Sequence, residues 1–186
     1  NVLKWAAYTA NLSMSVVACL SPLLFVTFNT LYGISYTKLG LLVLINFITQ
    51  LGVDLLLSFF PHKFNIKKTI RLIPVLVATG LLVYAVFPFV FKEHVYIGLV
   101  IGTVIFSASS GFNEVLANPL ILSIPSDNPD KELSKLHSVY PWGIVGVIIV
   151  GTAFLFGVGG ENWQWLALLF LRVPVTSIVL FSLTDM

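Results

Sequence analysis

The chain carries little charge for its length. Of its 186 residues, 10% are Asp, Glu, Lys or Arg, whereas 58% are hydrophobic. A water-soluble domain has about 25% charged residues, because its surface must be solvated. The composition therefore excludes a soluble enzyme, a nucleic-acid-binding protein and a disordered tail. It predicts a chain that is solvated by lipid.

Cysteine and the motifs of catalysis are scarce as well. Cys19 is the single cysteine, which excludes an internal disulfide and a cysteine-rich metal site. The His, Cys and carboxylate residues do not have the spacing of metal ligands. The sequence has neither a phosphate-binding glycine loop nor a nucleophile elbow. We therefore expect that the protein is not an enzyme and has no metal site and no cofactor.

Long apolar runs, by contrast, are abundant. A membrane-spanning helix needs about 20 mostly apolar residues. Six such runs, separated by polar breaks, lie at about residues 5–28, 39–60, 70–91, 95–124, 136–156 and 163–183. The alternating pattern of a transmembrane barrel is absent. The sequence predicts an all-α membrane protein in which residues 1–186 form one domain of six transmembrane helices.

Lys and Arg are distributed unevenly among the breaks. If the N-terminus is inside, seven basic residues lie inside and two lie outside: Lys4, Lys63, Lys67, Lys68, Arg71, Lys131 and Lys135 against Lys38 and Lys92. The positive-inside rule then places both ends of this chain in the cytoplasm. We expect a multi-pass protein of the cell membrane.

Three of the runs carry polar residues at helical spacing. The three sets are Tyr8, Asn11 and Ser15 in the first run, Asn46, Gln50, Asp54 and Ser58 in the second, and Ser107, Gly111, Glu114 and Asn118 in the fourth. Residues spaced in this way share one face of a helix. Polar groups are costly in lipid and usually face a cavity or one another. These three stripes are therefore expected to enclose a wet cavity.

A structural interpretation of the same residues is also open. Small residues such as those of Gly98-x-x-x-Gly102 allow close helix packing, and amides can hold helices together by hydrogen bonds. Asp54 lies near the end of its run, where it can pair with a loop lysine, and Arg172 can pair or reach the interface. Glu114 is the hardest to explain in this way, because it lies well inside the fourth run.

Several segments resemble a known transporter family. Residues Gly111–Pro119, GFNEVLANP, are similar to the fourth-span E-x-x-x-N-P pattern of the fucose/proton symporter branch of the major facilitator superfamily. The segments Tyr32–Leu42 and Leu136–Gly143 resemble the entries to the second and fifth spans of bacterial sugar permeases. Six spans with both ends inside, and a basic loop after the second span, resemble the N-terminal half of such a transporter.

This resemblance implies an alternating-access carrier built from 3+3 inverted repeats, with its central site between two six-helix halves. Pro22 and Pro119 lie at similar depths in the first and fourth runs, as such repeats predict. The chain opens at Asn1 rather than Met, and we expect it to be an excised half or one that must pair. Its expected partners are the lipid bilayer and a C-terminal six-helix half.

The expected ligands are a proton and a small, sugar-like solute. In the resembled branch, the residue matching Glu114 takes part in proton coupling and the residue matching Asn118 lines the sugar site. Asp54 is the second candidate for proton coupling. Sugars need amides for hydrogen bonds and aromatic faces for stacking, and the candidate substrate-binding residues of these types are Asn11, Gln50, Asn118, Tyr140 and Trp142.

Two other functions remain open. One is a carrier of a non-sugar solute, and the other is a non-transporting membrane sensor or scaffold of the same fold. A flux assay separates the sensor from the carrier, because a sensor can keep the binding stripes.

Overall fold

The computed structural model describes residues 2–184, and these form helices without any strand. Six segments are long and apolar enough to cross a membrane. They are α1 (Val2–Leu23), α3 (Tyr36–Phe59), α4 (Ile66–Val90), α5 (Val95–Leu122), α6 (Pro129–Val158), and α7 (Trp163–Phe170) followed by α8 (Arg172–Ser182). The prediction of an all-α chain with six long apolar helices is confirmed.

Two of the expected spans are interrupted. The first run predicts one helix, but α1 ends at Leu23 and the short helix α2 (Phe25–Tyr32) follows after Leu24. Pro22 lies in the last turn of α1, where its missing N–H removes a backbone hydrogen bond. The sixth run is also divided into two helices, because α7 ends before Leu171 and α8 begins after it.

Side-chain caps explain where two of the helices begin. Asn65 precedes α4 and Asn128 precedes α6, and each side-chain oxygen accepts a hydrogen bond from the backbone N–H three residues later. Such caps satisfy N–H groups that have no partner inside the helix. Pro129 follows the second cap at a position where its fixed φ favours a helix. As a result, α6 begins before residue 136, the start expected from the apolar run.

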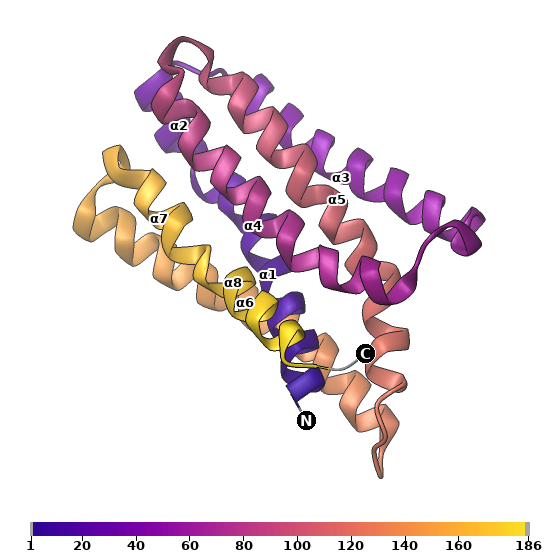
Figure 1. Ribbon diagram of the computed structural model, residues 1–186. Coiled ribbons are helices and arrows are strands. Elements are labelled where there is room, and N and C mark those ends of the chain that lie inside the picture. Colours follow the sequence, from indigo (N-terminus) through magenta and orange to yellow (C-terminus); the bar gives the residue numbers. More distant parts are fainter. Residues whose placement is uncertain (1, 185–186) are drawn as a thin grey trace.

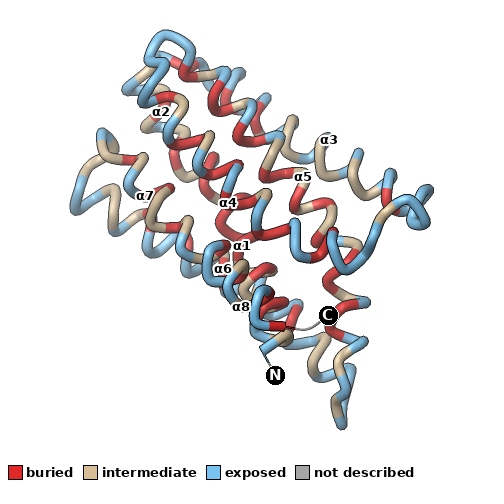
Figure 2. The backbone as a smooth tube through the Cα atoms, in the orientation of Figure 1, coloured by how far each residue is buried: buried red, intermediate tan, exposed pale blue. Residues whose placement is uncertain are grey.

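Glycine residues allow α4 and α5 to pack closely against each other. A methyl group added at Gly80 would lie 2.7 Å from Cβ of Phe106, and one added at Gly102 would lie 2.7 Å from Cβ of Tyr84. Each glycine thus leaves room for an aromatic residue of the facing helix. Figure 2 shows the buried residues along α1, α4 and α5, while α3 and α6 carry much of the exposed surface. Gly102 therefore serves close helix packing, which is the structural interpretation of the Gly98-x-x-x-Gly102 motif.

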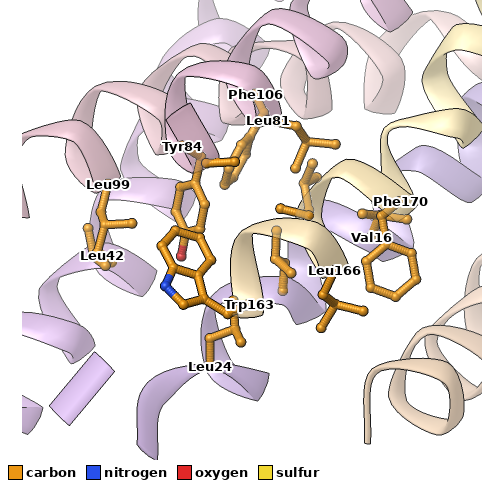
Figure 3. Packing of buried hydrophobic residues seen from close by; sticks show 14 of the residues in the cluster. Val16, Leu24, Leu42, Leu81, Tyr84, Leu99, Phe106, Trp163, Leu166 and Phe170 are labelled. Atoms are coloured by element: carbon orange, nitrogen blue, oxygen red, sulfur yellow. The ribbon is translucent and has the colours of Figure 1, made fainter. Parts of the chain in front are cut away.

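An aromatic cluster joins four helices at one end of the bundle. Phe28 of α2, Tyr84 of α4, Phe106 of α5 and Trp163 of α7 are all fully buried. Figure 3 shows Tyr84, Phe106 and Trp163 packed together. The rings of Phe28 and Trp163 meet edge to face, with centroids 4.9 Å apart. The hydroxyl groups of Tyr84 and Ser21 share a hydrogen bond of 2.8 Å, so the buried phenol has a partner.

The beginning of α1 and the end of α8 lie at the same end of the bundle (Figure 1). Ser177 of α8 donates a hydrogen bond to the Ala6 carbonyl oxygen at 3.2 Å. Arg71, at the start of α4, donates to the carbonyl oxygen of Thr184 at 2.7 Å. An even number of crossings brings both ends of a chain to one side, which agrees with this arrangement.

Candidate functional site

A cavity of about 450 Å³ lies between α1, α3, α5 and α6. Its wall includes apolar residues such as Phe47 and Phe106. The polar groups that line it are Asn11, Ser21, Asn46, Gln50, Thr103, Ser110, Asn113, Glu114, Asn118, His137 and Tyr140. All three expected stripes contribute to this wall, and α6 adds a fourth side.

The stripes of α3 and α5 face each other because the two helices touch at Gly111. A methyl group at Gly111 would lie 2.7 Å from the carbonyl oxygen of Gln50, so no larger residue fits without a shift. Three residues further along α5, Glu114 Oε2 accepts a hydrogen bond from Gln50 Nε2 at 3.0 Å. One turn before Gly111, Ser107 Oγ donates to Asn46 Oδ1 at 2.5 Å. The second and fourth runs are thus paired through their polar faces.

The two acidic candidates come from these facing helices. Glu114 lines the cavity, and no Lys or Arg of the described residues lines it with Glu114. Asp54 is half-buried beside the cavity rather than in its wall. Its Oδ1 is buried and has no hydrogen-bond partner among residues 2–184. The two carboxylates thus lie on facing helices, and of the two only Glu114 lines the cavity.

The stripe of α1 forms a ladder of hydrogen bonds with α6. Tyr8 Oη donates to the Glu132 carboxylate at 2.8 Å. Asn11 Nδ2 donates to the Leu136 carbonyl oxygen at 2.8 Å. Ser15 Oγ donates to the Tyr140 carbonyl oxygen at 2.9 Å. Glu132 also forms salt bridges with Lys4 and Lys135. The α1 stripe therefore serves mainly to join α1 to α6, and Asn11 alone of the three also lines the cavity.

Asn113 is a lining residue that the stripe pattern does not include. It is 5% exposed, and its Nδ2 donates to Asn11 Oδ1 at 3.0 Å, which joins α5 to α1. Thr103, Ser110 and Asn113 follow one another at intervals of seven and three residues and line the cavity together. This second polar face of α5, next to the stripe that contains Glu114, is the sequence signal that could have identified Asn113.

The five expected substrate-binding residues fall into two groups. Four of them line the cavity: Asn11, Gln50, Asn118 and Tyr140. Trp142 is 74% exposed and lies outside the cavity wall. It follows Tyr140 by two residues, which is about 200° around a helix, so the two side chains leave α6 on opposite sides. Among the described residues, no group of three or more His, Cys, Asp or Glu side chains could hold a metal ion.

A scan against protein-family models found no match to the chain, and searches of curated proteins and of solved structures found none either. The cavity and its side chains are therefore the basis for a functional proposal.

Proposed function

We propose that this chain forms one six-helix half of a secondary transporter of the major facilitator type. The transporter moves a small polar solute, with a sugar as the favoured class, by alternating access coupled to protons. The observation that carries this proposal is the cavity between α1, α3, α5 and α6, in which amide, hydroxyl and carboxylate groups gather inside an otherwise apolar bundle.

The size and chemistry of the cavity fit a small polyhydroxylated solute. Its volume of about 450 Å³ lies in the usual range for small-molecule sites, about 300–1,000 Å³. Asn118 and the Tyr140 hydroxyl line the wall and make no side-chain hydrogen bond within residues 2–184. Asn46 uses its oxygen to accept from Ser107, which leaves its N–H groups available. These groups offer both donors and acceptors, as sugar hydroxyls require.

The exposed faces of α3 and α6 support a second half as partner. Phe47 and Leu51 of α3 are 61% and 57% exposed, and Ile149 and Phe156 of α6 are 63% and 90% exposed. These two helices flank the cavity, and both expose large apolar side chains in the part of the chain that the structure describes. A second six-helix body that packed on them would give the cavity its missing wall.

Glu114 is the proposed proton-coupling group, and Asp54 on the facing helix α3 is the second candidate. A charged carboxylate is costly inside a membrane protein unless water or a cation reaches it. Opening the cavity admits water to Glu114, and closing it favours the protonated acid. Proton binding is then tied to the conformational change, because the open and closed states differ in their affinity for the proton.

The test uses Glu114→Gln, which keeps the shape of the side chain but cannot titrate. In proteoliposomes that contain the intact transporter, we expect this variant to lose uphill uptake of a labelled monosaccharide under an imposed pH gradient. Counterflow exchange should continue, because it needs binding and conformational change but no proton gradient. The matched control is Glu93→Gln, which removes a carboxylate outside the cavity and should leave both activities unchanged.

Two results would contradict the proposal. If Glu114→Gln still accumulates solute as the unmodified protein does, Glu114 is not the coupling group and Asp54 is the next residue to test. If the unmodified protein binds sugars but shows neither uptake nor counterflow, it is a sensor rather than a carrier.

A further inference from the structure

A second hollow is lined by residues at the end of α2, the end of α4 and the beginning of α7. These helix ends lie away from the chain termini (Figure 1). The hollow has a volume of about 850 Å³ and lies between the last turns of α4 and the first turns of α7, beside the end of α2. We call it the α4–α7 groove. It shares no residue with the cavity of the proposed transport site.

Both walls of the α4–α7 groove change from apolar to charged in the same direction. Along α4 the wall runs from Val86 and Phe89 to Lys92, in the short helix η2 (Lys92–His94). Along α7 it runs from Leu168 and Trp165 back to Glu161, in η3 (Gly160–Asn162). Phe89 and Trp165 are 67% and 66% exposed, so the apolar part is open to the surroundings of the bundle. A phospholipid has the same polarity along its length.

The charged end carries one cation and one anion that do not neutralise each other. Lys92 and Glu161 both line the groove, and neither forms a salt bridge within the part of the chain that the structure describes. A ligand that matches both residues needs a negative group for Lys92 and a positive group for Glu161. A phospholipid headgroup with a phosphate and an ammonium meets this requirement, whereas an anionic headgroup leaves Glu161 without a partner.

Two amides at this end also present free oxygen atoms. Asn162 Nδ2 donates to the Val158 carbonyl at 3.2 Å, and Gln164 Nε2 donates to the Tyr32 hydroxyl at 3.3 Å. The side-chain oxygens of both amides make no hydrogen bond within residues 2–184 and lie in residues that line the groove, as Glu161 does. Three acceptor groups suit a primary ammonium, which has three N–H donors. A trimethylated ammonium has none.

We propose that the α4–α7 groove binds a phospholipid of the phosphatidylethanolamine type. Its acyl chains lie along Phe89 and Trp165, its phosphate faces Lys92, and its primary ammonium donates to Glu161 and the two amide oxygens. The inference rests on the six long apolar helices crossing a membrane, because lipid then surrounds the open side of the groove.

The test measures quenching of Trp165 fluorescence by phospholipids with brominated acyl chains. Trp5→Phe and Trp142→Phe remove the two exposed tryptophans outside the groove, and Trp163 is fully buried. The protein is reconstituted in mixtures of phosphatidylethanolamine and phosphatidylcholine in which one of the two is brominated. From the quenching we expect phosphatidylethanolamine to bind the groove about two- to fivefold more tightly than phosphatidylcholine. The expected ratio is small because exposed ion pairs and hydrogen bonds contribute little free energy each.

Three single variants in this background test which residues determine the preference for phosphatidylethanolamine. Glu161→Gln and Lys92→Gln should reduce the preference towards equal binding, whereas Glu93→Gln, next to Lys92 but outside the groove, should retain it. All three residues are exposed, so these changes leave the folded core intact. Equal quenching by both lipids, or a preference unchanged in Glu161→Gln, would overturn the proposal. Absence of quenching by either lipid would also overturn it, since a protein segment would then cover the groove.

Discussion

The contact at Gly111 leads to a quantitative prediction for Gly111→Ala. The added methyl group would lie 2.7 Å from both the Gln50 carbonyl oxygen and Val53 Cβ, whereas packed carbon atoms lie about 3.5 Å apart or more. The helices α3 and α5 must therefore separate by about 0.8 Å. The hydrogen bond from Gln50 to Glu114, now 3.0 Å, would lengthen to about 3.8 Å and be lost. Overpacking of this kind costs about 1–3 kcal/mol.

The matched control is Gly52→Ala on α3, two residues after Gln50. A methyl group there meets no atom within 4 Å. Both variants gain the helix propensity of alanine, about 1 kcal/mol, so their difference isolates the clash. We expect the unfolding temperature of Gly111→Ala in lipid to be about 2–12 °C below that of Gly52→Ala, because 1 kcal/mol shifts a chain of this size by about 2–4 °C. Equal unfolding temperatures would refute the close contact between α3 and α5.

Two further predictions concern orientation and binding. In a Cys19→Ser background, an impermeant thiol reagent added to intact cells should label Lys92→Cys but not Lys67→Cys, and the reverse pattern would invert the topology. Asn118→Ala should lower solute affinity roughly two- to tenfold, the effect of losing one buried hydrogen bond, whereas Trp142→Ala should leave affinity unchanged because Trp142 lies outside the cavity. Equal losses in titration calorimetry of both variants would contradict the position of Trp142.

The fold was largely predictable because lipid imposes a simple rule on sequence. A run of about 20 apolar residues must be helical to satisfy its own backbone, so the six runs identified the six long helices. The breaks inside the first and sixth runs were less visible. Leu24 and Leu171 are themselves apolar, and the helix ends there although hydropathy continues. The early start of α6 depends on a capping side chain, Asn128, which an apolar scan does not register.

The contacts of the candidate site were predictable only where a hydrogen bond joins two polar side chains. Gln50 and Glu114 lie on stripes that the sequence displays, and the structure pairs them. Asn11 differs, because one of its partners is the backbone carbonyl of Leu136, and any residue type at that position supplies the same carbonyl. Trp142 lies on α6, a helix that lines the cavity. The side of α6 that faces the cavity depends on how α6 packs against its neighbouring helices, and Trp142 lies on another side.

The ladder between α1 and α6 has a consequence for biosynthesis. Its bonds join residues 124 or 125 positions apart, so Tyr8, Asn11 and Ser15 have no permanent partner when α1 leaves the ribosome. At 5–20 residues per second, the interval before α6 is made lasts about 6–25 s. During that time the three donor groups of the first helix lack the acceptors that α6 later supplies. It must wait beside the insertion machinery, or in contact with water, until the fifth crossing arrives.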